Sequence, residues 1–438
     1  MLDLDAMMLR PPRLAWTFVV SIVLLSPACV VSLSARNEPL TNGGVTGELV
    51  DCSQVTPLGI GSISTGPAQT KLVGRYDTSD PAVAKFDWSG NVMSARFQGT
   101  TEVSVGLSCC KDADGNDVDA DIIFEAKVDD LDPFEFTVSA TTQPPSYTIA
   151  TNLAADQPHE ITIMRNTEPQ KGITQFTGFN FGSGVQLPPT IRPRRIEIIG
   201  DSITCGYGNM GNNASCPYDE VVDPTRPDVR VPVTENEYLA YGSIAARTLS
   251  ADAVILCYSG KGVVLNLNDK AGTEPTTTMP QYYERTICND PTSQWDFGGP
   301  DDPEPQVVVI NLGTNDFSRD NNLDGVPDGI DLDAFQAGYL TFVRTIRQHR
   351  PNAHIFLAVS PMLTDQYPLA NARTNQRNVL GNIVNELNAE NDTKVYRIEF
   401  VEQGTRYGLG CDYHPNLTVH GIMADQLVGA IRSKTCWQ

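Results

Sequence analysis

Residues 195–204 read RIEIIGDSIT, an isoleucine-rich run that ends in Gly-Asp-Ser-Ile-Thr. Residues 195–199 of this run are predicted to form a strand. Ser202 follows the carboxyl end of the predicted strand, and ligands bind at that edge of open α/β sheets. Ser202 is therefore placed as a nucleophile would be, although the triplet alone is equally compatible with a helix cap or a turn.

Apolar runs alternate with amphipathic segments from residue 195 to the C-terminus. Strands are predicted at 195–199, 253–258, 306–312, 353–359 and 394–400, and helices at 237–249, 333–349, 375–388 and 417–431. Strands that alternate with helices form a parallel sheet with helices on both faces. The sequence therefore predicts a three-layer α/β/α domain over residues 189–438.

The preceding segment, residues 51–188, has a different periodicity. Apolar and other residues alternate at 101–107 and again at 134–138, and turn residues separate such runs. Short alternating strands of this kind predict an antiparallel β-sandwich. Two domains also agree with a length of 438 residues, which is more than one hydrophobic core usually organises.

The N-terminus has the pattern of an export signal. Two arginines precede an apolar run at 14–31, and small residues follow, so residues 1–35 are predicted to be a signal peptide. A permanent membrane anchor, or a lipid on Cys29, is the alternative. Residues 36–50 are polar and glycine-rich and predict a linker. We expect a secreted or cell-surface protein with no other contact with a membrane.

Charge and cysteine content restrict the partners further. The formal net charge is −22, which disfavours nucleic acids and anionic lipid surfaces but not a neutral substrate. Nine of the ten cysteines lie beyond Cys29, and in an exported chain they predict disulfides with one cysteine left over. No CxxC pair occurs, so no zinc site is predicted.

Polar groups follow two further predicted strands. Gly260 comes after the strand at 253–258 and offers an uncovered backbone N–H, and Asn315 comes after the strand at 306–312 and carries an amide donor. Such donors stabilise an oxygen that gains negative charge during a reaction. A tight turn and an Asx turn are the alternative interpretations.

A serine nucleophile needs a base, because its hydroxyl is almost never ionised at neutral pH. The chain has five histidines, and His414 is the one predicted at the same sheet edge as Ser202. Pro415 marks the start of the last helix, which places His414 in the loop before it. His414 is therefore the candidate base.

These segments, in this order, resemble the four blocks of the SGNH (GDSL-type) hydrolases, whose domain is flavodoxin-like. The resemblance covers residues 195–435. It implies that Ser202 is the nucleophile and His414 the general base. It also implies an oxyanion hole made of the backbone N–H groups of Ser202 and Gly260 and the side chain of Asn315.

A narrower resemblance is to carbohydrate esterase family 2. It rests on GDSITCGYGN (200–209), TEN (234–236), SGKGV (259–263), MP (279–280), WDF (295–297), CDYHP (411–415), and, before them, WSG (88–90) and RFQGT (96–100). The resemblance implies an N-terminal jelly-roll domain before the hydrolase domain. It also implies an esterase that removes O-acetyl groups from plant polysaccharides such as xylan and glucomannan. We expect a monomer that needs no cofactor.

The family patterns are not matched everywhere. The commoner SGNH pattern has an aspartate three residues before the histidine, where Cys411 stands here. Asp412 is the nearest acid and is predicted as the third catalytic residue, with a backbone carbonyl as the alternative partner of the His414 ring. Tyr413 stands where the family usually has tryptophan, and Tyr413 and Trp295 are the predicted sugar contacts.

Residues 320–331 place oxygen ligands at loop positions 1, 3, 5, 9 and 12, with glycine at position 6, which is the spacing of a calcium loop. Aspartate at position 12 and proline at position 8 depart from that pattern. A solvated acidic loop is the preferred interpretation, so no metal site is predicted.

Two other functions compete with the acetylesterase. An SGNH lipase or lysophospholipase would need an apolar lid, whereas the segments 209–235 and 261–305 are polar and carry several aromatic residues. A carbohydrate-binding surface protein without activity is the second. The joint presence of Ser202, Asn315 and His414 argues against it.

Overall fold

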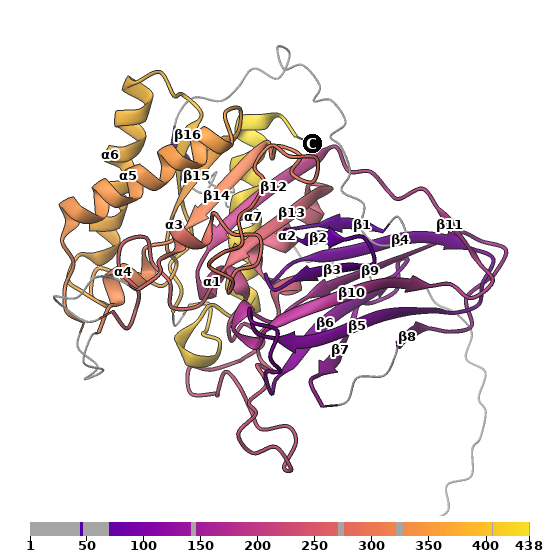
Figure 1. Cartoon of the computed structure of the whole chain (residues 1–438). Helices are drawn as coiled ribbons and strands as arrows, with labels where there is room; N and C mark the ends of the chain where they lie inside the picture. Colours follow the sequence, from indigo (N-terminus) through magenta and orange to yellow (C-terminus); the bar gives the residue numbers. More distant parts are fainter. Residues whose placement is uncertain are drawn as a thin grey trace, which may run out of the picture. The chain divides into compact units, whose positions relative to one another are not determined.

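The computed structural model describes residues 44–46, 70–141, 146–269, 276–320, 327–404 and 406–437, which form three β-sheets (Figure 1). The predicted signal peptide, Cys29 and most of the predicted linker lie outside the described residues, as does the middle of the acidic loop at 320–331. Among the described helices, none combines the length and the apolar character that a membrane span requires.

The first two sheets are antiparallel and pack face to face. Their strands are β1 (Lys71–Val73), β2 (Asp77–Asp80), β3 (Val83–Phe86), β4 (Val92–Gln98), β5 (Val103–Lys111), β6 (Asp121–Val128), β7 (Phe134–Ser139), β8 (Tyr147–Ala150), β9 (His159–Arg165), β10 (Ile173–Asn180) and β11 (Val185–Leu187). One sheet has the order β1-β4-β9-β6-β7, with β11 paired to β4, and the other the order β2-β3-β10-β5-β8. Residues of β5 alternate between buried and half-buried, as predicted for one face against a core. The sandwich is confirmed.

The third sheet is parallel, with the strand order β13-β12-β14-β15-β16. Its strands are β12 (Arg194–Gly200), β13 (Ala251–Cys257), β14 (Val307–Asn311), β15 (His354–Val359) and β16 (Val395–Glu399). All five were predicted to within two residues at each end. The domain boundary predicted at residue 188 falls between β11 and β12.

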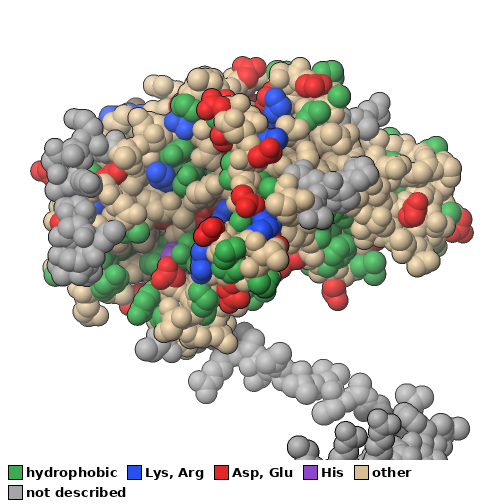
Figure 2. Space-filling view, turned by 60° about the horizontal axis from the view of Figure 1, so that its bottom comes forward, with side chains coloured by type: hydrophobic (Ala, Val, Ile, Leu, Met, Phe, Trp, Pro, Cys, Tyr) green, Lys and Arg blue, Asp and Glu red, His purple; other side chains and the backbone are tan. Residues whose placement is uncertain are grey.

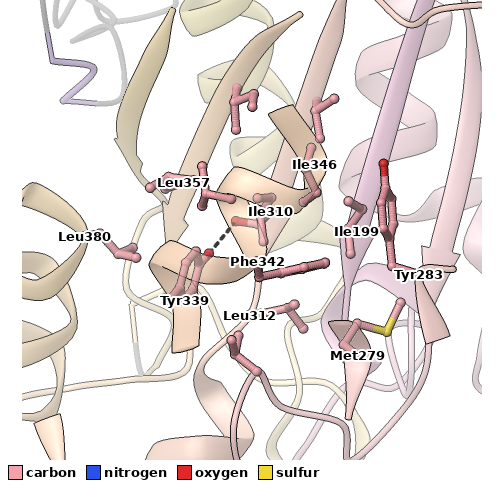
Figure 3. Packing of buried hydrophobic residues seen from close by; sticks show 14 of the residues in the cluster. Ile199, Met279, Tyr283, Ile310, Leu312, Tyr339, Phe342, Ile346, Leu357 and Leu380 are labelled. Carbon is pink, nitrogen blue, oxygen red and sulfur yellow. Dashed lines mark hydrogen bonds between the residues drawn. The ribbon is translucent and has the colours of Figure 1, made fainter. Parts of the chain in front are cut away.

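Helices cover both faces of the parallel sheet, so the predicted three-layer fold is confirmed. The helices are α1 (Ser202–Cys205), α2 (Tyr241–Thr248), α3 (Met279–Tyr282), α4 (Thr314–Ser318), α5 (Leu332–His349), α6 (Ala372–Ala389) and α7 (Leu417–Thr435). Alternate residues of β14 point to opposite faces: Val308 and Ile310 pack with α5 and α6, whereas Val307 and Val309 pack with α2 and α7. Figure 3 shows the first face, where the Tyr339 hydroxyl donates a hydrogen bond to the Ile310 carbonyl at 3.4 Å.

The helix predicted at 237–249 is interrupted. The 3₁₀ turn η4 (Glu237–Leu239) comes first, Ala240 is extended, and α2 begins at Tyr241. The break lets the Tyr241 N–H donate to Nδ1 of His420 in α7, at 3.0 Å. A hydrogen bond to another helix therefore takes the place of the helical hydrogen bonds at this position. The periodicity of the sequence could not predict this break.

The turn between β3 and β4 packs against the parallel-sheet domain. Trp88 is fully buried, and its Nε1–H donates to the Thr286 carbonyl at 3.0 Å. The Asp87 carboxylate accepts from the backbone N–H of Cys288 and of the next residue, at 2.7 and 2.9 Å. Gly90 has a φ of 72°, and a Cβ there would lie 2.5 Å from a side chain of β13. Glycine is therefore required where the two domains approach closely.

A buried ionic network explains the charged residue in the middle of β12. The Glu197 carboxylate contacts the guanidinium groups of Arg350, at 3.0 Å, and of Arg75 in the sandwich, at 3.5 Å. Arg350 also contacts Asp302, at 2.5 Å. Burial opposes the charge on Glu197, but the two cations outweigh it and the pKa of this carboxyl is lowered. The pairing lets a charge stand inside a buried strand.

The disulfide prediction is confirmed in the described part of the chain. Disulfides join Cys109 to Cys110, Cys205 to Cys257 and Cys216 to Cys411. Cys288 is a free, buried thiol. One bridge joins the end of α1, just after Ser202, to the end of β13, and another holds the segment just before His414.

Replacement of Glu197 by alanine is expected to lower the free energy of unfolding by about 3–5 kcal/mol, because it removes the carboxylate that the buried Arg75 pairs with and leaves Arg350 with Asp302 alone. Urea unfolding followed by fluorescence measures the loss. The matched control is Glu386→Ala, which removes an exposed carboxylate 3.1 Å from Arg344 and should cost less than about 1 kcal/mol. Similar losses for the two variants would contradict the role given to the buried network.

Candidate active site

The turn from β12 into α1 positions Ser202. A Cβ on Gly200 would lie 1.9 Å from the Thr204 hydroxyl, so the chain can turn this sharply only with glycine there. Asp201 caps α1, because its carboxylate accepts from the Ile203 N–H at 3.0 Å. Ser202 is the first residue of α1 and is 8% exposed. One interpretation of the Gly-Asp-Ser triplet was that the serine caps a helix. Asp201 makes this cap instead, so the Ser202 hydroxyl is not used for capping.

His414 lies beside Ser202, as the sequence predicts. Its Nε2 atom is 2.8 Å from the Ser202 hydroxyl oxygen, across 212 residues of sequence. Asn416 caps α7 by accepting from the Val419 N–H, and His414 stands in the loop just before this cap. The disulfide from Cys216 to Cys411 anchors the same loop.

The third partner of the histidine is a carbonyl and not a carboxylate. Nδ1 of His414 lies 2.9 Å from the backbone oxygen of Asp412. The Asp412 carboxylate instead accepts from the Tyr207 hydroxyl at 3.0 Å. Asp412 has left-handed backbone angles (φ 51°, ψ 42°), which turn its carbonyl toward the ring and its side chain away. The expectation of Asp412 as a third catalytic side chain is therefore corrected in favour of the backbone alternative.

This arrangement sets the protonation of the ring. A carbonyl can only accept, so Nδ1 carries the proton and Nε2 is free to accept one from Ser202. Burial lowers the pKa of His414 to about 4, although the carbonyl and the charge of Asp412 act in the opposite direction. The imidazole is therefore neutral at pH 7, which is the state a general base needs.

Two of the predicted oxyanion donors lie at neighbouring strand ends. The Tyr258 N–H donates to the Gly200 carbonyl at 3.3 Å, which brings the segment after β13 beside the Ser202 turn. Gly260 has a φ of 77°, and apart from its two chain neighbours no described residue has an atom within 4 Å of where its Cβ would be. The backbone at Gly260 is thus uncovered, as close approach of a ligand requires.

The Asn315 amide is held against the same segment. Its Nδ2 donates to the Lys261 carbonyl at 2.9 Å and lies 3.5 Å from the Asp201 carboxylate. The second contact is too long for a strong hydrogen bond. One N–H of Asn315 is therefore left without a close acceptor among the described residues.

Two buried aspartates support this geometry and were not predicted. Asp316 accepts from the backbone N–H groups of three successive residues, Val263 to Leu265, at 2.8 to 3.0 Å. It thereby fixes the segment after Gly260. Burial raises the pKa of Asp201 to about 7 and that of Asp316 to about 6. The only sequence signal was that each acid adjoins a predicted site residue.

An aromatic stack covers the histidine and was also missed. The Tyr207 ring lies 4.3 Å from that of His414 and stacks face to face on Tyr218, with 3.7 Å between ring centroids. The Tyr218 hydroxyl donates to Glu235 at 3.0 Å. Tyr207 and Glu235 both lie in motifs that carried the family resemblance, but the sequence gave no sign that they act together.

The two predicted sugar contacts are placed differently. Tyr413 is 64% exposed and is the residue directly before His414. Trp295 is contacted by the Arg75 guanidinium, 5.4 Å from its ring, and lines a cavity of about 300 Å³ together with Tyr76 and other residues of the sandwich. Tyr413 is therefore adjacent to His414 in the chain, whereas the described residues around Trp295 include neither Ser202 nor His414.

The acidic loop gives no metal site within the described residues. Residues 321–326 lie outside them, and Asp331, at the last ligand position, caps α5 by accepting from two backbone N–H groups at 3.0 Å. One group of potential ligands is found elsewhere in the described part of the chain, formed by Glu168, Cys205 and Glu235. Cys205 forms a disulfide with Cys257, so it has no thiolate that could bind a metal ion.

Two sequence families match the two parts of this chain. Residues 72–190 match the family described as carbohydrate esterase 2 N-terminal. Residues 196–427 match the family described as GDSL-like lipase/acylhydrolase.

Curated relatives are similar over most of the chain. Cellulase/esterase CelE of Acetivibrio thermocellus is 36% identical over 367 residues, which cover 83% of this chain but only 39% of that protein. An acetylxylan esterase / glucomannan deacetylase of Cellvibrio japonicus is 28% identical over 383 residues, which cover 85% of this chain and 92% of that protein.

Solved structures of carbohydrate esterases are also similar to this chain. A family two carbohydrate esterase from Clostridium thermocellum, in complex with cellohexaose, is 34% identical with a TM-score of 0.68, and the match covers 84% of this chain and 99% of that one. A family 2 enzyme of Corynascus thermopiles is 30% identical with a TM-score of 0.69, and covers 84% of this chain and 100% of that one. By sequence and by structure, this chain belongs to carbohydrate esterase family 2, with a hydrolase domain of the GDSL type.

Proposed function

We propose that this chain is an exported, monomeric serine esterase that removes O-acetyl groups from plant-type polysaccharides. The observation that carries the proposal is the 2.8 Å contact between the Ser202 hydroxyl and Nε2 of a neutral His414 whose Nδ1 is held by a carbonyl. A hydroxyl in contact with a free imidazole nitrogen is the arrangement of an activated nucleophile. Membership of an esterase family supports the same conclusion.

In the acylation half-reaction, Nε2 of His414 takes the proton of the Ser202 hydroxyl as Oγ attacks the acetyl carbonyl carbon. The carbonyl oxygen gains a negative charge, and the N–H groups of Ser202 and Gly260 and the Asn315 amide donate to it. The bond from carbon to the sugar oxygen then breaks. That oxygen takes the proton from Nε2 and leaves as the sugar alcohol, with acetyl-Ser202 behind it.

In the deacylation half-reaction, water takes the place of the sugar. Nε2 of His414 accepts a proton from the water as its oxygen attacks the acetyl carbon. Collapse of the second tetrahedral intermediate breaks the bond to Oγ, and the proton on Nε2 returns to Ser202. Acetic acid leaves and ionises in solution, and the enzyme is restored.

The backbone carbonyl of Asp412 orients the His414 ring, which is the role of the third residue in a catalytic triad. It fixes the tautomer and the ring plane of His414, as the aspartate of a serine protease triad does. It carries a dipole and no full charge, so it stabilises the imidazolium less than an ion pair would. The Asp412 carboxylate contributes at longer range, since its charge favours the protonated ring.

A polysaccharide substrate is supported by several observations. Relatives bear the names acetylxylan esterase and glucomannan deacetylase, and one solved relative holds cellohexaose. Tyr413 exposes its ring beside His414, where a sugar ring can stack. A neutral acetylated sugar meets no repulsion from a chain of net charge −22.

The lipase alternative has less support. An enzyme for long acyl chains would expose a continuous apolar surface near its site. On the face shown in Figure 2, hydrophobic side chains lie in small groups between charged and other polar ones. Turnover of short against long acyl esters separates the two functions.

Ser202→Ala is expected to lower kcat for acetate release from acetylated glucomannan or xylan by about 10⁴- to 10⁶-fold. Asn315→Ala should lower it by about 10²- to 10³-fold, the usual cost of one oxyanion donor. Ser433→Ala, on the last helix, is the matched control and should leave kcat unchanged. Full activity of Ser202→Ala, or a preference for fatty-acyl esters, would overturn the proposal.

The Asp412→Asn variant tests whether the backbone carbonyl or the side-chain carboxylate of Asp412 is the functional partner of His414. Asparagine keeps the backbone carbonyl and tolerates left-handed backbone angles, so kcat should fall by less than about 10-fold. A catalytic carboxylate at this position would cost about 10⁴-fold instead. Steady-state kinetics with 4-nitrophenyl acetate distinguishes the two outcomes.

The pH profile tests the protonation of His414. Its pKa is lowered to about 4, and the base works only when neutral, so kcat/KM should rise through about pH 4 and be constant from pH 6 to neutrality. Enzyme held at pH 4 and assayed at pH 7 controls for acid unfolding. An acid limb at pH 6.5 or above would contradict the environment described for the ring.

A further inference from the structure

Two glutamates from different domains meet beneath the active site. Glu168 follows β9 of the sandwich and directly precedes the 3₁₀ turn η3 (Pro169–Lys171), whereas Glu235 lies just before η4 in the hydrolase domain. Each residue is 1% exposed, and their carboxylates belong to a group of atoms that all lie within 4.8 Å of one another. Two ionised carboxylates this close in a buried site would repel each other strongly.

The donors around the two groups are unequal. Glu168 accepts from the Ser259 N–H at 2.7 Å, from the Ser259 hydroxyl, and from the Gln170 amide at 2.9 Å. Glu235 accepts from the Tyr218 hydroxyl through Oε2, whereas its buried Oε1 has no hydrogen-bond donor among the described residues. A proton on Glu235, donated to Glu168, would satisfy this buried oxygen.

The groups that face Glu235 also favour its protonated state. Burial and the negative charge of Glu168 raise the pKa of Glu235 well above the ordinary value, and the Tyr218 hydroxyl and the Glu168 backbone N–H oppose this only partly. Arg165 is the nearby cation, but its guanidinium donates to the carbonyls of Thr167, Glu168 and Gly172 and to a threonine hydroxyl, at 2.8 to 3.0 Å. Among the described residues, no hydrogen bond joins this guanidinium to either carboxylate of the pair.

Each member of the pair touches one side of the catalytic site. Glu168 holds Ser259, the residue before the donor Gly260. Glu235 holds Tyr218, whose ring stacks on Tyr207, and Tyr207 packs against His414. A change in the separation of the two carboxyl groups would thus move the oxyanion donor or the base.

We propose that Glu168 and Glu235 share one proton, and that this acid pair is a positioning element that sets Gly260 and His414 relative to each other. The proposal rests on the esterase function proposed above. It gives the sandwich domain a part in catalysis through Glu168. Loss of the shared proton places two negative charges side by side and separates the two supports.

Glu235→Gln and Glu235→Leu test the pair. Glutamine imitates the protonated acid, because its amide can donate to Glu168, and should keep kcat within about 3-fold at pH 7. Leucine removes the hydrogen bonds on both sides and should lower kcat by about 10- to 100-fold, the range expected for small misplacements, with little change in KM. The wild type should lose kcat at alkaline pH as the shared proton leaves, and Glu235→Gln should not.

Glu135→Gln is the matched control. Glu135 is also an interdomain carboxylate, which accepts from Asn236 at 2.8 Å, and in the part of the chain that the structure describes no hydrogen bond joins it to Ser259 or Tyr218. This variant should keep the alkaline limb of the wild type. Wild-type kcat in Glu235→Leu, or the same alkaline limb in Glu235→Gln, would overturn the proposal.

An infrared measurement keeps the test independent of activity. The carbonyl band of a protonated carboxylic acid should be present at pH 7 in the wild type and reduced in Glu235→Gln. Identical bands in the two proteins would overturn the shared proton even if the esterase is active. An inactive wild type with the expected difference in this band would instead contradict the esterase function and leave the acid pair in place.

Discussion

A single hydrogen bond, from the Ser202 hydroxyl to Nε2 of His414, depends on nearly every element of the hydrolase domain. The serine is placed by the central strand β12 and a turn that tolerates only glycine at position 200. The histidine is placed by the last helix, whose cap follows it, and by the disulfide from Cys216 to Cys411. The parallel sheet brings these distant segments to one edge, because the carboxyl ends of its strands all lie there.

The buried acids of the hydrolase domain have separate roles. Glu197, between two arginines, keeps a lowered pKa and joins the sandwich to β12. Asp201 and Asp316 are buried with raised pKa values and serve as acceptors for backbone N–H groups at the strand ends. The base itself is oriented by a carbonyl, so the site positions its histidine without an ion pair. In the mechanism proposed above, catalysis depends on orientation and on the oxyanion donors more than on charge at the base.

The sequence predicted the parts that depend on local pattern. Apolar runs located the strands of the parallel sheet, and their carboxyl ends located Ser202, Gly260 and Asn315, because chain order and sheet geometry are coupled. The break at Ala240, the carbonyl of Asp412 and the stack of Tyr207 on Tyr218 were not predictable in this way. Each depends on backbone angles or on a partner far away in the chain, as does the packing of Trp295 on Arg75. Residue type alone carries none of this information.

The central claim is that acetyl is transferred to Ser202 before water removes it. Rapid quenching of the enzyme during turnover of an activated acetyl ester, followed by peptide mass spectrometry, tests this claim most directly. The account predicts one acetyl group on the peptide that contains Ser202, and its disappearance when the ester is consumed. Turnover with no acetylated peptide, or with acetyl on another residue, would contradict it.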